Sequence, residues 1–206
     1  MIIAVDGPTA SGKGTIARKL AQRYGLPHLD TGLLYRAVGR QVALMGGNPD
    51  DPGDALAATE FPEKLLDDPV LRNEETGGLA SRVSVHPAVR EELFLRQRAF
   101  ATQPGGAVLD GRDIGTVIAP EAQVKLFITA SVDARAQRRF REMTERGIPA
   151  TLDASAEDLR RRDARDTGRK DAPLRVAEGA FVIDTSEMSR EQALAAAIEA
   201  VELAAR

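Results

Sequence analysis

The chain has 206 residues and a formal net charge of −3. This length fits one α/β domain with insertions, and the charge gives no overall attraction to nucleic acid or to an anionic membrane. The absence of cysteine excludes disulfides and thiolate chemistry and is typical of a reducing cytoplasm. Because no signal peptide and no long apolar segment are recognisable, we expect a cytoplasmic protein without a membrane segment.

The N-terminal stretch predicts a phosphate-binding loop. An apolar run over residues 1–5 indicates a buried strand, and residues 16–24 indicate a helix that ends at Gly25. Between them lies Gly7-Pro8-Thr9-Ala10-Ser11-Gly12-Lys13-Gly14-Thr15. Backbone N–H groups of such a loop and of the helix N-terminus hold phosphates, the glycines allow close approach, and Lys13 adds a charge.

Two other interpretations of this loop are weaker. An ordinary strand–helix connection is shorter and needs no lysine. A dinucleotide motif could begin at Gly12 and use Asp30, but it would start five residues too late after the strand. Lys13 is followed by Gly14, so the usual hydroxyl moves to Thr15, and we expect Mg²⁺ to be held mainly through water and substrate oxygens.

The next hundred residues predict a short strand followed by helices. Residues 26–30 form the expected second strand, and a helix is expected from about 33 to 45. Arg36 lies near the expected start of that helix, where a cation opposes the macrodipole, so it either meets an anionic ligand or is solvated. A turn cluster over 48–53 precedes a polar helical stretch over 54–100, which predicts an inserted helical subdomain. His86 is interpreted as a turn residue there and not as a ligand.

A third strand is expected over 105–110, with Asp110 at its carboxyl end and Arg112 and Asp113 just beyond. Ligands of open α/β sheets bind at this end of the strands, which favours a functional interpretation over a surface loop. Asp110 resembles the acidic residue that lies near Mg²⁺ in nucleotide triphosphatases. Residues 124–129 form the expected fourth strand, and Ser131 begins the helix that follows.

Ten arginines lie between Arg135 and Arg169. A break over 147–149 separates two expected helices, of which the second starts at Ser155 as an approximate capping box. Arg162, Asp166 and Arg169 share one face of it. The segment is consistent with salt-bridged solvated helices, with an RNA-binding patch in which Phe140 is the only aromatic for base stacking, or with a mobile lid whose arginines close over phosphates. The phosphate loop favours the lid.

Residues 180–184 form the expected fifth strand, and Ser189 with Gln192 caps the last helix. Alternating strands and helices predict an α/β fold, with a five-stranded parallel sheet and helices on both faces.

At this point a family resemblance is clear. It rests on Asp6-Gly7-Pro8, Gly12-Lys13-Gly14-Thr15, Asp30-Thr31-Gly32 with Tyr35-Arg36, Ser81, Arg90, Arg96-Gln97-Arg98-Ala99-Phe100, Asp110-Gly111-Arg112-Asp113-Ile114-Gly115-Thr116 and Arg162-Asp163-Ala164-Arg165-Asp166-Thr167-Gly168-Arg169. Over nearly its whole length the chain resembles bacterial cytidylate kinases of the nucleoside-monophosphate kinase family, P-loop kinases in which Lys-Gly-Thr is normal.

The resemblance implies a single kinase domain over 1–206. Its core would be 1–31, 101–140 and 161–206, its monophosphate-binding insert 32–100, and its arginine-rich lid 141–160. The implied reaction transfers the γ-phosphoryl group of ATP to CMP or dCMP with Mg²⁺ as cofactor, in pyrimidine nucleotide metabolism. The implied partners are these nucleotides, with no nucleic acid and no membrane, and the implied state is a monomer.

The resemblance also implies site residues. ATP phosphates would contact Gly7 to Thr15, and Mg²⁺ would lie near Thr15 and Asp110. The catalytic cations would be Lys13, Arg112, Arg162 and Arg169. CMP would contact Thr31, Arg36, Ser81, Arg90, Arg112, Asp113, Arg162, Asp166 and Arg169, of which Arg36, Arg112 and Arg169 would hold the phosphate, Ser81, Arg90 and Asp113 the base, and Arg162 and Asp166 the ribose.

One departure concerns the insert, where family members often carry a small antiparallel sheet. Only residues 71–76 remain at that place, without a hairpin pattern.

Three function classes differ in what they need. A phosphotransferase acting on a monophosphate needs positioning and charge neutralisation but no general base, which fits a chain with two histidines. A nicotinamide oxidoreductase and a non-catalytic nucleotide- or RNA-binding module are the alternatives.

Overall fold

The computed structural model describes residues 1–204 and divides into two compact units. The core unit comprises Met1–Leu29 and the chain from Ala101 onward, and the insert unit comprises Asp30–Phe100. Within residues 1–204, no helix combines the length and the hydropathy that a membrane crossing requires.

The core unit is built on a five-stranded parallel sheet with strand order β2-β3-β1-β4-β5. The strands are β1 (Ile2–Asp6), β2 (His28–Asp30), β3 (Ala107–Gly111), β4 (Val124–Thr129) and β5 (Phe181–Asp184). In the register of the central strands, Ile3 pairs with both Val108 and Val124. Every residue of β1 and β3 is buried, as expected for central parallel strands covered on both faces. The predicted fold class is confirmed.

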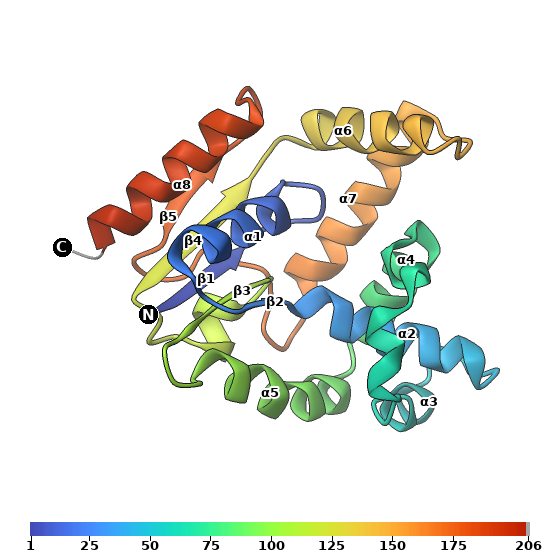
Figure 1. Ribbon diagram of the computed structural model, residues 1–206. Coiled ribbons are helices and arrows are strands. Elements are labelled where there is room, and N and C mark those ends of the chain that lie inside the picture. Colours follow the sequence, from blue (N-terminus) through green and yellow to red (C-terminus); the bar gives the residue numbers. More distant parts are fainter. Residues whose placement is uncertain (205–206) are drawn as a thin grey trace. The chain divides into compact units, whose positions relative to one another are not determined.

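One face of the sheet is covered by α1 (Lys13–Tyr24) and α8 (Arg190–Ala204), which lie side by side (Figure 1). Ile3 of β1 packs there with Leu20 of α1 and Ala197 of α8 in a fully buried apolar cluster. Since this cluster fixes α1 against the sheet, it also fixes the loop that joins β1 to α1.

The opposite face meets a short π-helix, η3 (Ile114–Ile118). Asp6 points to this face, and its carboxylate accepts the N–H groups of Ile114 and Gly115, each at 2.8 Å. Gly115 packs against the side chain of Lys125 on β4. The segment after β3 is thereby tied to the end of β1.

Two helices, α6 (Val132–Glu145) and α7 (Leu152–Gly168), follow β4 and pack against each other (Figure 1). The predicted cap is confirmed for α6, where Ser131 accepts the N–H of Ala134 at 3.2 Å. The predicted start of α7 at Ser155 is wrong. Thr151 accepts the N–H of Ala154 and caps the helix earlier, so Ser155 is a buried interior residue.

The insert unit is helical throughout, as predicted. Its elements are α2 (Thr31–Leu44), α3 (Pro52–Ala57), η1 (Glu63–Asp67), η2 (Pro69–Arg72), α4 (Glu74–Val83) and α5 (Pro87–Ala101). No strand occurs between residues 31 and 100, and η2 with the start of α4 occupies 71–76. Because α2 begins directly after Asp30, Arg36 lies beyond its first turn, so the predicted position of Arg36 in that turn is wrong.

The predicted strand over 105–110 begins too early. Gly105 and Gly106 have φ of 90° and 91°, and a Cβ on Gly106 would lie 2.1 Å from the carbonyl oxygen of Met1. These two residues therefore form a turn that only glycine fits, and β3 starts at Ala107. At the last helix the predicted cap is confirmed, because the Ser189 hydroxyl accepts from Gln192 N while Gln192 Oε1 accepts from Ser189 N.

Candidate functional site

The loop between β1 and α1 turns back over the N-terminus of α1. Gly7 passes so close to β4 that a Cβ there would lie 2.0 Å from the carbonyl oxygen of Ile128. Gly12 adopts the left-handed conformation at φ 91°, and its carbonyl accepts the N–H groups of Thr15 and Ile16. Lys13 opens the helix, and its ammonium group donates to the carbonyl of Pro8 at 3.2 Å. The backbone thus has the shape that the phosphate-loop pattern predicts.

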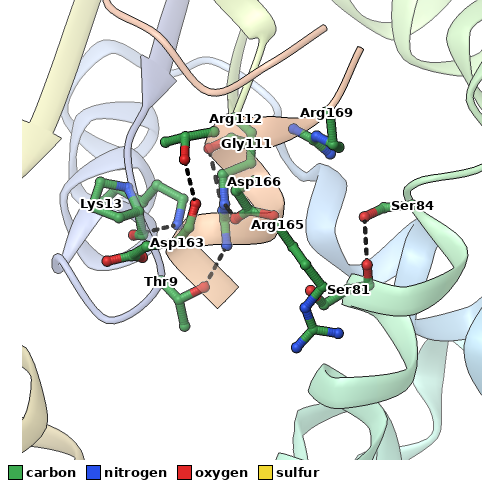
Figure 2. Close-up of polar contacts among 12 residues, drawn as sticks. Thr9, Lys13, Ser81, Ser84, Gly111, Arg112, Asp163, Arg165, Asp166 and Arg169 are labelled. Atoms are coloured by element: carbon green, nitrogen blue, oxygen red, sulfur yellow. Dashed lines mark hydrogen bonds and ion pairs between the residues drawn. The ribbon is translucent and has the colours of Figure 1, made fainter. Parts of the chain in front are cut away.

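Arg112, which follows β3, links this loop to α7 (Figure 2). Its Nε donates to Asp166 Oδ2 at 2.8 Å, and its Nη2 donates to the Thr9 hydroxyl at 2.7 Å. Asp166 is buried on α7. The structure therefore brings a residue of the phosphate loop, one from the end of β3 and one from α7 into direct contact.

Charged side chains converge around Asp166. Burial alone would raise the pKa of this carboxyl, but Arg112, Arg169 and Lys13 together hold the pKa below its ordinary value. Burial lowers the pKa of the Arg162 guanidinium, with Arg112 acting in the same direction and Asp166 opposing it. The four predicted catalytic cations thus lie within electrostatic reach of one carboxylate.

Arg169 lies just past the end of α7, where its Nη2 donates to the carbonyl of Ala172 at 3.1 Å. It follows the last helical residue, so the predicted placement of Arg162, Asp166 and Arg169 on one helical face holds only for the first two. As the C-cap residue three positions after Asp166, Arg169 is still near enough for its charge to lower the pKa of that carboxyl.

A second arginine–aspartate pair also meets the phosphate loop. Arg135 on α6 makes two hydrogen bonds to Asp163 on α7, at 3.0 and 2.6 Å, and donates to the Thr9 carbonyl at 3.2 Å. Arg135 is almost wholly buried. Thr9 therefore accepts from Arg112 through its hydroxyl and from Arg135 through its carbonyl.

The remaining arginine contacts differ between the inner and outer surfaces of these helices. Arg139 and Arg162 are buried and share Asp158, at 3.2 and 2.9 Å. Arg146–Glu142 and Arg160–Glu157 are exposed pairs three or four residues apart. Such exposed pairs contribute little to stability, so only the inner arginines form an organised set.

Asp6, at the end of β1, holds the backbone that follows Arg112 and Asp113. Burial raises the pKa of its carboxyl to about 7, although the N–H groups of Gly115 and Ile114 and the charge of Lys13 favour ionisation; Asp113 raises the pKa further. Asp113 is itself buried, and it is the residue from which η3 begins. The hydrogen bonds of Asp6 thus fix the backbone directly after Asp113.

Asp110 lies between β2 and the phosphate loop. Its Oδ1 is 2.7 Å from His28 Nε2, and its Oδ2 is 3.4 Å from the position that a Cβ on Gly14 would occupy. Thr15, next in the loop, is exposed. Among residues 1–204, no group of three or more His, Cys, Asp or Glu side chains is arranged to hold a metal ion. One carboxylate and one hydroxyl fit a cation that keeps water and ligand oxygens in its shell, as Mg²⁺ does.

In the insert unit, two predicted arginines have structural contacts. Arg36 Nη1 donates to the carbonyls of Leu71 and Asn73, both at 2.8 Å. The Arg90 guanidinium lies over the ring of Tyr35, 5.7 Å from its centroid, and is buried. Both side chains are therefore held in place by the unit that carries them.

The two hydroxyl residues predicted in the insert unit differ. Thr31 is buried at the first position of α2. The Ser81 hydroxyl on α4 is buried without a hydrogen-bond partner among the described residues, while the Ser81 carbonyl accepts from Ser84 (Figure 2). Burying a hydroxyl without a hydrogen-bond partner costs free energy, so the Ser81 hydroxyl could still form a hydrogen bond to a ligand.

Comparison with known proteins identifies the family. Residues 3–51 and 59–203 match the family described as cytidylate kinase. The chain belongs to the cytidylate kinase family. A cytidylate kinase of Xanthobacter autotrophicus is 53% identical over 98% of this chain and 97% of that protein, and one of Methylobacterium sp. is 57% identical over 87% and 86%. These matches confirm the resemblance found from the motifs.

A solved structure supports the fold of this cytidylate kinase family member. An uncharacterized protein from Eubacterium ventriosum aligns with a TM-score of 0.57 over 98% of each chain, at 15% identity. At that identity the likeness concerns the fold alone. Family membership, together with a loop that starts at Gly7 directly after β1, decides against the dinucleotide-binding alternative.

Sequence reasoning missed three features of the family member's site. The expected strand stops at Val5 and the expected loop starts at Gly7, so Asp6 received no structural role. The His28–Asp110 pair joins residues 82 apart, and the contacts of Thr9 with Arg135 span 126 residues. Only the position of Asp6 at the end of a strand gave a local signal; the other two depend on the order of the strands.

Proposed function

We propose that this chain transfers the γ-phosphoryl group of ATP to CMP and dCMP by direct in-line transfer, giving the diphosphates. The observation that carries the proposal is the convergence of Lys13, Arg112, Arg162 and Arg169 on Asp166 beside the phosphate loop. Phosphoryl transfer requires several cations around the migrating group and its neighbours. Membership of the cytidylate kinase family supports the choice of acceptor.

The phosphate loop, Gly7 to Thr15, holds the ATP phosphates in this proposal. The left-handed Gly12 and the N-terminus of α1 present backbone N–H groups, and Lys13 supplies the charge nearest to the migrating phosphoryl group. Lys13 would exchange its bond with the Pro8 carbonyl for phosphate oxygens. Mg²⁺ would lie near Thr15 and Asp110 and would neutralise phosphate charge when bound.

The residues proposed to bind CMP occur in both units. In the core unit, Arg112 and Arg169 would contact the CMP phosphate, Asp113 the base, and Arg162 with Asp166 the ribose. The insert unit, Asp30–Phe100, contains the proposed monophosphate-binding region over 32–100. In this unit, Arg36 would contact the phosphate, Ser81 and Arg90 the base, and Thr31 the nucleotide. The buried Ser81 hydroxyl without a partner supports its part in base recognition.

No general base is needed. A phosphate monoester has a second pKa of about 6, so CMP is mostly dianionic and nucleophilic at neutral pH. The residues act by positioning the acceptor in line and by neutralising charge. Water must be excluded, or ATP would be hydrolysed, and residues 141–160, at the facing ends of α6 and α7, are the proposed lid.

The proposed setting is pyrimidine nucleotide metabolism in the bacterial cytoplasm, with the enzyme as a monomer. The absence of cysteine and the bacterial origin of the relatives support this setting.

A coupled assay of ADP release tests the proposal. With ATP and Mg²⁺ present, CMP and dCMP should support turnover, while UMP, AMP and shikimate should support much less. ATP binding without ADP release for any acceptor would favour a non-catalytic nucleotide-binding module. Turnover that is highest with AMP would reject the assignment of the base site.

A further inference from the structure

A histidine and a carboxylate form a close pair beside the phosphate loop. His28 Nε2 lies 2.7 Å from Asp110 Oδ1, and Asp110 is 3% exposed. The His28 side chain is mostly buried as well. A carboxylate oxygen accepts hydrogen bonds, so Nε2 carries the hydrogen in this contact. No step of the proposed phosphoryl transfer uses His28.

The sheet places the two residues together. The N–H of Val108 donates to the carbonyl of Pro27 at 2.9 Å, which aligns the chain entering β2 with β3. His28 comes one residue after Pro27, and Asp110 comes two residues after Val108. The pair is therefore fixed by strand pairing and not by flexible loops.

The second oxygen of Asp110 faces the phosphate loop. Oδ2 lies 3.4 Å from the position that a Cβ on Gly14 would occupy, in the first turn of α1 next to Lys13. A carboxylate rotates broadly about its last torsion unless a hydrogen bond holds it. Because His28 holds Oδ1, Oδ2 is directed at the part of the loop where nucleotide phosphates and their cation are proposed to bind.

We propose that His28 is a positioning residue for the binding of magnesium-loaded ATP. It fixes Asp110 so that Oδ2 meets the hydration shell of the cation, in the way that outer hydrogen bonds orient metal-binding carboxylates in other proteins. This inference rests on the proposed function, because it requires ATP and Mg²⁺ on the phosphate loop.

The test compares two substitutions at His28. His28→Leu removes the donor and keeps an apolar side chain of moderate size, whereas His28→Gln keeps an N–H donor at similar reach. The other histidine gives a matched control, because His86 Nε2 lies 2.9 Å from the Pro49 carbonyl within the insert unit. His86→Leu therefore also removes a buried histidine and its hydrogen bond, without touching Asp110.

Affinity for a non-hydrolysable ATP analogue is measured by calorimetry, once with Mg²⁺ and once with EDTA, for folded variants. We expect His28→Leu to weaken binding with Mg²⁺ by about 10- to 100-fold, the scale of lost outer-shell contacts, and to leave metal-free binding nearly unchanged. His28→Gln should restore most of the loss, and His86→Leu should change neither affinity.

Equal losses with and without Mg²⁺, or no loss at all, would overturn the role of His28. If His28→Leu does not fold, His28→Asn replaces it, because its shorter amide cannot reach Asp110 whereas the amide of His28→Gln can. Equal magnesium dependence of ATP binding in His28→Asn and His28→Gln would also overturn the role. A wild-type chain that binds no ATP would remove the proposed function itself, which distinguishes that failure from failure of His28 alone.

Discussion

Asp6 connects the start of the phosphate loop to the segment that carries Arg112 and Asp113. Its carboxylate accepts the N–H groups of Ile114 and Gly115 at the beginning of η3. Any tilt of this carboxylate would move the backbone next to Asp113 and, through it, the residues proposed to bind CMP. Asp6 therefore stabilises the site without contacting the nucleotide.

The pKa of Asp6 makes the stability of the unliganded chain depend on pH. Because burial raises the folded-state pKa of Asp6 to about 7, from an ordinary value of 3.8, the folded chain keeps a proton that the unfolded chain has released. This contribution is complete below about pH 4 and is lost as pH rises through 7. Relative to Asp6→Asn, the wild type should gain about 2 kcal/mol of unfolding free energy between pH 8 and pH 5.5.

Urea unfolding at several pH values measures this difference. Both proteins contain every other ionisable group of the chain, so the difference isolates Asp6. Parallel pH profiles for wild type and Asp6→Asn would show that the carboxyl is ionised throughout.

Asp113 is the residue that we propose to distinguish cytosine from uracil. A carboxylate accepts from the N4 amino group of cytosine but repels O4 of uracil. Asp113→Ala should therefore lower kcat/KM for CMP more than for UMP. The CMP/UMP ratio of kcat/KM should fall by the equivalent of about 1–3 kcal/mol, the scale of one good base contact. Asp113→Asn, whose amide can donate to O4, should reduce the ratio at least as far.

Steady-state kinetics with both acceptors measures the ratio, and ATP affinity serves as the control. An equal fall for CMP and UMP would assign Asp113 to the architecture of η3, and base recognition would have to lie elsewhere.

At the residue scale, the sequence motifs predict candidate site residues but not the contacts that hold them. Lys13, Arg112 and Asp166 were identified from motifs, because short spacing along the chain encodes them. The hydrogen bonds of Arg112 to Asp166 and to Thr9 span 54 and 103 residues, so they depend on the order in which the strands pair. No local pattern carries that information.

Between elements, the crossing of α2 and α4 depends on one glycine. A Cβ on Gly39 would lie 2.7 Å from Leu79 Cβ and 3.0 Å from the backbone nitrogen of Ala80. Helix α4 carries Ser81 immediately after these contacts. Gly39→Ala should therefore push the helices apart at a cost of about 1–3 kcal/mol, as overpacked substitutions do, and should raise KM for CMP more than KM for ATP.

A second glycine provides the matched control. Gly78 lies in α4 with nothing within 4 Å of its Cβ position, so Gly78→Ala should stabilise the helix by about 0.5–1 kcal/mol. Hydrogen exchange in α2 and α4 should accelerate in Gly39→Ala and slow in Gly78→Ala. Changes of the same sign in both variants would refute the close-packing explanation.

Element boundaries were predicted well where a cap or glycine is unambiguous, as at Gly25 and Ser189. They were wrong where the sequence offers two possible N-cap residues, because Thr151 caps α7 four residues before Ser155. They were also wrong at Gly105 and Gly106, where the approach of Met1, a tertiary contact, requires a turn. Propensity alone does not contain such contacts.

At the scale of the whole molecule, the lid proposal predicts a response to ligands. ATP and CMP together should slow hydrogen exchange over residues 141–160, because the arginines of α6 and α7 would then bind phosphate. Exchange in α8, which packs in the sheet's apolar cluster, should stay unchanged. Unchanged exchange over 141–160 with both ligands at saturation would favour solvated helices without a lid function.

The overall architecture was predictable because strands and helices alternate with clear apolar patterns, which leaves few arrangements for a parallel sheet. The helical character of Asp30–Phe100 was equally visible from its polar helical pattern and its proline and glycine breaks. The placement of η3 was not visible, because the buried carboxylate of Asp6 organises it from 108 residues away.

In the proposed reaction, Lys13 neutralises charge on the phosphoryl group that moves from ATP to CMP. The most direct measurement is turnover with saturating ATP and CMP for folded Lys13→Met, with Lys19→Met, an exposed position on the same helix, as control. We expect turnover to fall by about 10²–10⁴ for Lys13→Met, the scale of one lost electrostatic group, and to stay unchanged for Lys19→Met. Near-normal turnover of Lys13→Met would rule out this role of Lys13.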